Sequence, residues 1–182
     1  TAYKPTRFTI ATSQVALCGF CHQSFGPKVL GSDKFVHGPV ATGSCVICHD
    51  PHGGNGKGLT REKVVTLCMR CHADTVAREV KNGLHEDEVC TDCHNPHGAD
   101  NPELTVAKGN ELCKKCHEEI NADGSGHPIA GHPVSADVDP SKPGRPMDCL
   151  SCHKVHGAPD VAKLKILANE QLQRKFCFRC HY

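Results

Sequence analysis

Hydrophobic positions along this chain fall into short runs, separated by stretches rich in glycine, proline and charged residues. The clearest helical periodicity covers residues 60–81. Thr60 can cap the start of this helix, and the pair Asn82 and Gly83 is expected to end it. The pattern therefore predicts one helix of moderate length in the first half of the chain.

The remaining pattern predicts little regular structure. Leucines recur at roughly helical spacing after Asp160, which predicts a second helix over residues 161–179. A shorter helix is expected to end at Cys113. Glycines punctuate residues 53–58, which are expected to form a turn, and no segment has the alternation of a strand. We predict a mostly irregular fold with a few short α-helices and little or no β-sheet.

One motif, Cys-x-x-Cys-His, occurs seven times and uses all fourteen cysteines. The motifs, numbered one to seven in chain order, are Cys18-Cys21-His22, Cys45-Cys48-His49, Cys68-Cys71-His72, Cys90-Cys93-His94, Cys113-Cys116-His117, Cys149-Cys152-His153 and Cys177-Cys180-His181. This spacing is typical of c-type haem attachment, in which both thiols bond to porphyrin vinyl groups and the histidine binds iron. The sequence predicts seven covalently attached haem c groups.

Zinc binding and disulfide formation account for the cysteines less well. Zinc sites need two Cys-x-x-Cys pairs for each metal, or a separate histidine pair, and seven motifs do not divide into pairs. A disulfide framework gives no reason for seven identical spacings that each end in histidine. Haem attachment is therefore the favoured interpretation.

Seven histidines lie outside the motifs, which is the number needed to give every iron a second axial histidine. They are His37, His52, His85, His97, His127, His132 and His156. Methionine is the rival axial ligand. Met69 lies inside motif three and is poorly placed, so Met147 is the alternative that the sequence leaves open. We expect bis-histidine ligation throughout, with all fourteen histidines bound to iron.

The motifs are arranged in repeated pairs. Motifs two and three begin 23 residues apart, as do motifs four and five, and the pairs share the text CHDPHG and CHNPHG. Motifs six and seven form a stretched pair with the text CHKVHG, in which Val155 replaces proline. We predict a single seven-haem domain over residues 1–182. Its expected parts are a half unit (1–36) and three doubled units (37–84, 85–120 and 121–182).

Three of the additional histidines, His52, His97 and His156, follow a motif histidine by three residues. On a helical turn this is about 5 Å along the axis, too close for the two residues to bind opposite faces of one haem. The simplest assignment sends each to the haem of the next motif: His52 to motif three, His97 to motif five and His156 to motif seven. Four histidines stay unassigned: His37, His85, His127 and His132.

The composition leaves little material for an ordinary hydrophobic core. Each motif has about 26 residues of chain, aromatic residues make up 4%, tryptophan is absent and the mean hydropathy is −0.40. The porphyrins are therefore expected to form the interior and, with their ligands, to hold the fold together.

Charge and hydropathy argue against nucleic-acid binding and against a membrane span. The polypeptide has a formal charge of +1, and seven ferric haems with their propionates would bring this to about −6, so nucleic-acid binding is not expected. No run of 18 apolar residues occurs, so no membrane span is expected. Because prokaryotes attach haem c outside the cytoplasm, we expect a processed, exported protein, extracellular or at the cell surface, with the periplasm as the alternative.

The repeated motifs resemble those of the multihaem c-type cytochromes with doubled CxxCH motifs, over nearly the whole chain. The resemblance implies ligand roles for the motif histidines and, more loosely, for His52, His97 and His156. The haem density also resembles that of polymeric extracellular cytochromes from metal-respiring microorganisms, in which haems form a continuous chain through stacked subunits.

Three functions follow as hypotheses, in order of preference. The first is the repeating subunit of an extracellular electron-conducting filament, with a homopolymer, other redox proteins and extracellular acceptors as partners. The second is a discrete periplasmic or surface electron shuttle. The third is a multihaem reductase, which needs an exchangeable axial position that the histidine count leaves no room for. We therefore expect an electron carrier and not an enzyme.

Overall fold

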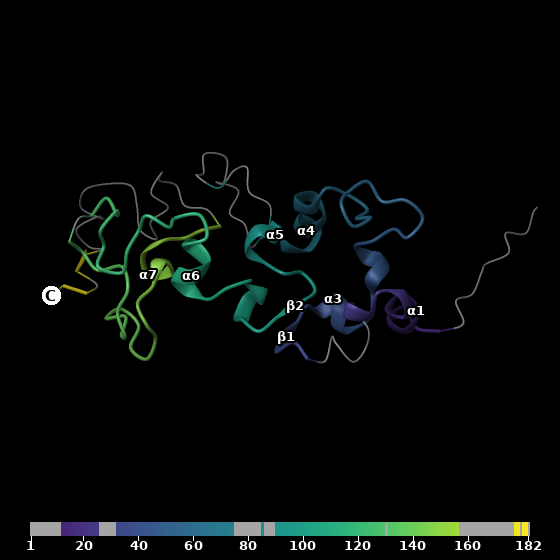
Figure 1. The fold of residues 1–182 in the computed structure, drawn as a ribbon, viewed down its shortest axis with the longest axis horizontal. Coiled ribbons are helices and arrows are strands. Elements are labelled where there is room, and N and C mark those ends of the chain that lie inside the picture. Colours follow the sequence, from purple (N-terminus) through teal and green to yellow (C-terminus); the bar gives the residue numbers. More distant parts are fainter. Residues whose placement is uncertain are drawn as a thin grey trace, which may run out of the picture. The chain divides into compact units, whose positions relative to one another are not determined.

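The computed structural model describes residues 12–25, 32–74, 85, 90–129, 131–156, 177–178 and 180–181. Short helices joined by turns and irregular segments make up this part of the chain (Figure 1). The expected fold class, mostly irregular with a few short α-helices, is therefore confirmed. Internal contacts divide the chain into two compact units, Thr1–Leu67 with His94–Thr105 and Cys68–Cys93 with Val106–Tyr182.

In the first unit, the longest helix carries motif one. This helix, α1 (Gln14–Cys21), begins after Ser13, whose hydroxyl accepts a hydrogen bond of 3.2 Å from the Ala16 N–H. Such a cap satisfies one of the backbone donors left free at a helix start. The shorter elements of this unit are η1 (Gln23–Phe25), α3 (Gly38–Ala41), η2 (Cys45–Ile47) and η4 (Pro102–Leu104).

The helix that carries motif three, α4 (Val64–His72), is shorter than the sequence predicted. Thr60 does not cap it, because this residue pairs with His49 in an isolated backbone bridge. The Thr60 side chain is nearly buried, and its hydroxyl donates to the carbonyl of Glu62 at 2.9 Å. The Thr60 hydroxyl thus bonds to a neighbouring carbonyl instead of capping the helix. Residues 75–81 of the predicted helix lie outside the described residues.

In the described part of the second unit, three helices each carry part of a haem motif. These helices are α5 (Cys90–Cys93), α6 (Gly109–Cys113) and α7 (Cys149–Cys152). The predicted short helix ending at Cys113 is confirmed. The helix expected over residues 161–179 lies almost wholly outside the described residues.

Two strands of two residues each form a small antiparallel sheet in the first unit. They are β1 (Phe35–Val36) and β2 (Gly98–Ala99). Phe35 pairs with Ala99, and Val36 pairs with Gly98. This pairing brings together the histidines beside them, since the N–H of His37 donates to the carbonyl of His97 at 3.3 Å.

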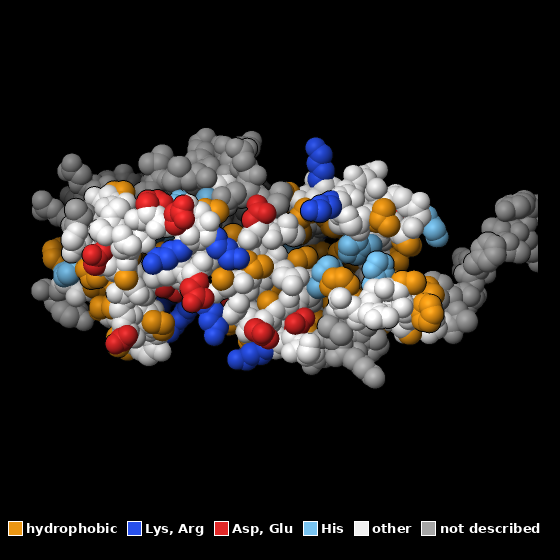
Figure 2. Space-filling model, in the orientation of Figure 1, with side chains coloured by type: hydrophobic (Ala, Val, Ile, Leu, Met, Phe, Trp, Pro, Cys, Tyr) orange, Lys and Arg blue, Asp and Glu red, His pale blue; other side chains and the backbone are white. Residues whose placement is uncertain are grey.

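Apolar side chains in the described residues do not form a dry core. No large side chain there is fully buried, and Phe20 and Phe178 are 84% and 63% exposed. On the face drawn in Figure 2, histidine side chains lie next to hydrophobic ones. These exposed apolar surfaces are suited to contact with a large apolar group that is bound beside the histidines.

Candidate haem sites

The fourteen motif cysteines are all free thiols. Each of these thiols could form a thioether to a porphyrin vinyl group. Within the described ranges, no group of three or more histidine, cysteine or acidic side chains converges on a metal position. A porphyrin supplies four nitrogens itself and needs only axial ligands from the protein.

Histidine rings in the described part of the chain lie opposite one another in pairs. Each of the four pairs given next joins one motif histidine to one histidine outside the motifs. The pairs are His49 with His97 at 6.0 Å between ring centroids, His85 with His117 at 6.2 Å, His127 with His153 at 6.0 Å, and His132 with His181 at 6.0 Å.

These separations fit a metal ion held between two imidazoles. A metal lies about 2 Å from each imidazole nitrogen, and that nitrogen lies about 1.2 Å from its ring centroid, which gives about 6 Å between centroids. Rings in direct contact span about 4.5–7 Å between centroids, so the composition of the pairs, one motif and one non-motif histidine in each, carries the argument together with this fit. Both the spacing and the composition of the pairs therefore suit axial ligation of haem iron.

The ring pairs differ in their relative orientation. The planes of His49 and His97 are nearly parallel, at 16°. The angle is 47° for the pair of motif five and rises to 70° and 76° for the pairs of motifs six and seven.

In motif two, the orientation of His49 is set by a hydrogen bond. Its Nδ1 lies 2.7 Å from the carbonyl oxygen of Gly58, an acceptor that requires the proton on Nδ1. The other nitrogen, Nε2, is then the one with a free lone pair for a metal. Opposite it, the ring of Phe25 packs on His97 with centroids 4.5 Å apart. Contacts within the protein thus help to orient both rings.

The same turn recurs 45 residues later, at motif four. His94 Nδ1 lies 2.7 Å from the carbonyl oxygen of Glu103, as His49 does from Gly58. The Asp50 N–H donates to the Leu59 carbonyl at 2.8 Å, and in the later repeat the Asn95 N–H donates to the Leu104 carbonyl at the same distance. The sequence analysis missed these carbonyl acceptors, although the repeat distance of 45 residues could have indicated them.

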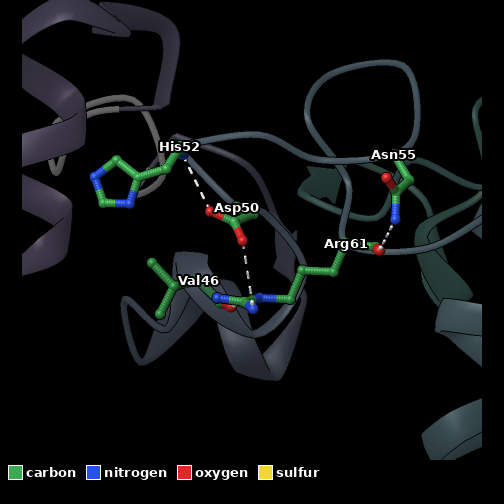
Figure 3. A network of polar contacts seen from close by, with 5 residues as sticks. All are labelled: Val46, Asp50, His52, Asn55 and Arg61. Carbon is green, nitrogen blue, oxygen red and sulfur yellow. Dashed lines mark hydrogen bonds and ion pairs between the residues drawn. The ribbon is translucent and has the colours of Figure 1, made fainter.

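Around His52, a polar network holds the backbone (Figure 3). The His52 N–H donates to Asp50 Oδ1 at 3.0 Å, and the other carboxylate oxygen lies 3.8 Å from the guanidinium of Arg61. Arg61 Nε donates to the Val46 carbonyl at 2.6 Å, and the Asn55 side chain donates to the Arg61 carbonyl at 3.4 Å. The network fixes the backbone at His52 and leaves its exposed imidazole free of any hydrogen bond within the network.

Electrostatics keeps two of the paired histidines neutral. Burial lowers the pKa of His97, and the neighbouring imidazoles of His49 and His37 lower it further. Burial and two further histidines lower the pKa of His127 in the same way. A neutral imidazole is the form that binds a metal, so both rings are prepared for ligation near neutral pH.

Thiols of different motifs are in contact at two places. Cys18 lies beside Cys45, whose pKa is raised by burial and by that neighbour. In the second unit, a hydrogen bond between the two thiols raises the pKa of Cys113 and lowers that of Cys149 to about 7. Asn110 Oδ1 accepts from the Cys149 N–H at 2.8 Å and from its thiol at 2.9 Å. Motifs one and two, and motifs five and six, are therefore adjacent.

The simplest ligand assignment from the sequence is not supported for two histidines. His97 was expected at motif five, but it lies opposite His49 of motif two, and His85 lies opposite the motif-five histidine. His156 was expected at motif seven, where His132 lies opposite the motif histidine. Pairing of β1 with β2 brings His97 back to the first unit, a long-range contact that sequence spacing does not contain. The assignment of His52 to motif three stays a prediction.

Comparison with known proteins agrees with the motif pattern. The doubled CXXCH motif family matches this chain three times, over residues 37–77, 82–122 and 142–182, about two thirds of its length. The chain therefore belongs to this family. It is a multihaem c-type cytochrome, which confirms the resemblance drawn from the motifs.

A curated relative is the multiheme cytochrome MtrA of Shewanella baltica (strain OS185). The two are 34% identical over 90 residues, which cover 38% of this chain and 26% of the relative. The chain thus matches about a quarter of that protein.

In the part of the chain that the structure describes, no helix is long and apolar enough to cross a membrane.

Proposed function

We propose that the chain carries seven haem c groups, each attached through the two cysteines of a motif and ligated by two histidines, and that it transfers electrons along them. The observation that carries this proposal is the set of four histidine pairs, each with one motif and one non-motif ring about 6 Å apart. The remaining three motifs would complete the set with His37, His52 and His156.

Haem iron supplies one-electron exchange between its ferric and ferrous states. The chain's own residues would supply two imidazoles to each iron and would so exclude other ligands. The backbone carbonyls of Gly58 and Glu103 fix the tautomer of two motif histidines. A rigid, fully ligated centre suits electron transfer, and it disfavours a reductase, which needs an exchangeable position for substrate.

The thiol contacts support a relay between motifs. Because Cys113 touches Cys149, groups attached through these sulfurs are neighbours. The contact between Cys18 and Cys45 has the same consequence at motifs one and two. Adjacent redox groups favour electron transfer within the chain over the isolated action of each group.

For the assembled state, we propose the repeating subunit of an extracellular electron-conducting filament. About 26 residues for each motif cannot enclose a haem on all sides, and exposed apolar side chains such as Phe20 remain available to a second copy. Partners would be further copies of the chain, other redox proteins and extracellular acceptors. The alternative is a discrete periplasmic or cell-surface electron shuttle.

Two measurements test these proposals separately. The intact mass of the native protein should equal that of the polypeptide plus seven haems, and fewer haems would contradict the full count. Cryo-electron microscopy of the native extracellular fraction should then show filaments with haems continuing across each subunit boundary. Dispersed particles with seven haems would reject the filament and retain the electron-transfer function.

A further inference from the structure

We infer that one short loop supplies the second axial ligand to two different irons, those of motifs six and seven. The loop comprises residues 121–129 and 131–134 and is called the histidine loop below. The inference rests on the proposed function, since both irons belong to haems. It goes further by assigning His127 to motif six and His132 to motif seven.

The ring geometry carries the assignment. His127 lies opposite His153 with centroids 6.0 Å apart and planes at 70°. His132 lies opposite His181 with centroids also 6.0 Å apart and planes at 76°. The two loop histidines therefore face different motif histidines, at the separation expected for a metal between each pair.

Hydrogen bonds close the histidine loop at its base. The N–H of Val134 donates to the carbonyl of Ala122 at 3.1 Å, so both ligand histidines lie on the segment between these residues. Inside the loop, the Asn121 N–H donates to the Ser125 carbonyl at 2.9 Å. Closure by backbone bonds reduces the conformational freedom that ligand binding would otherwise have to remove.

Gly124 allows the loop to fold back on itself. Its φ of +87° is a left-handed conformation that favours glycine, and a Cβ at this position would overlap the carbonyl oxygen of His132. The close approach of these two residues holds the halves of the loop together. The position of His132 thus depends on the absence of a side chain at Gly124.

Asn110 ties the loop to motif six. Its Nδ2 donates to the Val134 carbonyl at 3.3 Å, while its Oδ1 accepts from the Cys149 N–H at 2.8 Å. One side chain thereby connects the base of the loop to the helix that begins the motif. This link holds the base of the histidine loop beside motif six.

The two loop histidines differ in the hydrogen bond at Nδ1. His132 Nδ1 lies 2.9 Å from the carbonyl oxygen of Pro133, an acceptor that leaves Nε2 free for a metal. His127 Nδ1 instead accepts a hydrogen bond from the Ile129 N–H at 3.3 Å. Ligation through Nε2 requires this ring to move its proton to Nδ1 and release that long hydrogen bond.

The ring angles give each assignment a spectroscopic signature. Low-spin ferric haems with near-perpendicular axial imidazoles give an electron paramagnetic resonance signal with a large maximum g value, whereas near-parallel imidazoles give a rhombic signal. The pairs of motifs six and seven should belong to the first type, and the pair of His49 and His97, at 16°, to the second.

The test replaces each loop histidine by methionine in the holoprotein. His127→Met and His132→Met should each remove one large-g signal and add one near-infrared methionine-to-iron charge-transfer band, and the double variant should remove two signals. Val138→Met is the matched control: it places a methionine at a position that is 55% exposed and outside the histidine loop, and it should leave the spectrum unchanged.

A second set of variants identifies the motif. With Cys149→Ala and Cys152→Ala, which remove the haem of motif six, the band from His127→Met should disappear and that from His132→Met should stay. Unchanged spectra in both single methionine variants, or loss of the His132→Met band in this background, would overturn the inference. A wild-type protein without haem would instead contradict the proposed function.

Discussion

Gly58 and Glu103 occupy the same position of a turn in successive repeats, and the carbonyl of each accepts a hydrogen bond from a motif histidine nine residues earlier. Both residues have a left-handed backbone, with φ of 72° and 54°. The turn therefore needs this conformation wherever it orients a histidine. Glycine adopts it without strain, whereas a glutamate does so at a cost of about 1–2 kcal/mol.

Glu103→Gly should stabilise the protein. Relief of the left-handed strain, about 1–2 kcal/mol, exceeds the greater entropy of glycine in the unfolded chain, about 0.4–1 kcal/mol. We expect a net gain of about 0.5–1 kcal/mol, measured as an increased guanidinium midpoint while the low-spin Soret band is monitored. The converse control is Gly58→Ala. The added Cβ would meet no neighbouring atom, so the substitution acts only through strain of the left-handed backbone and should lower the midpoint. Equal midpoints for both variants would contradict the strain argument.

His97→Met should change the haem of motif two. Methionine in place of one axial histidine raises the reduction potential of that haem and adds a near-infrared charge-transfer band. Phe25→Leu is the matched control, because it alters the ring that packs on His97 and keeps the ligand. The new band should vanish when Cys45 and Cys48 are both replaced by alanine, and its persistence would show that His97 serves another motif.

Asn110→Ala should destabilise the second unit. The substitution leaves the N–H of Cys149 and the carbonyl of Val134 without their partner, which costs about 1–3 kcal/mol. Asn110→Asp retains the acceptor and loses the donor. Its free energy of unfolding, measured in guanidinium, should therefore fall by less than that of Asn110→Ala. If both variants unfold at the wild-type midpoint, Asn110 does not connect the histidine loop to motif six.

Asp139 should contribute stability that depends on pH. Its carboxylate, only 2% exposed, accepts from the Ser141 hydroxyl at 2.6 Å and the Ser141 N–H at 2.8 Å. The hydroxyl bond is the main cause that lowers its pKa, and Ser151 contributes in the same direction. Because the folded pKa is depressed, the contribution is complete above the unfolded pKa and is lost as pH falls through the folded value.

Unfolding midpoints measured from neutral pH into the acid range test this dependence. Asp139→Asn should flatten the acid limb of the curve, because the amide does not titrate. Asp137→Asn, at an exposed position two residues earlier, should follow the wild-type curve. An acid limb that is unchanged in Asp139→Asn would assign the pH dependence to other groups.

The sequence predicted the irregular fold and the class of cofactor because both depend on local features. Two thiols and a histidine at fixed spacing are sufficient to attach a haem, whatever surrounds them. The short helix ending at Cys113 was also recognisable, whereas the longer one was overestimated, because Thr60 binds Glu62 and pairs with His49 instead of capping. A capping residue competes for its hydrogen bonds with tertiary partners that no local pattern reveals.

By itself, the sequence determined the seven motifs, the equal number of additional histidines and the lack of material for an ordinary core. Only the tertiary structure decided which histidines face each other. His97 lies 48 residues from His49 in sequence, and a four-residue sheet brings them together. Axial ligands approach an iron from opposite sides, so their pairing depends on how distant segments pack. Spacing along the chain predicts the attachment of each haem, and the packing predicts its second ligand.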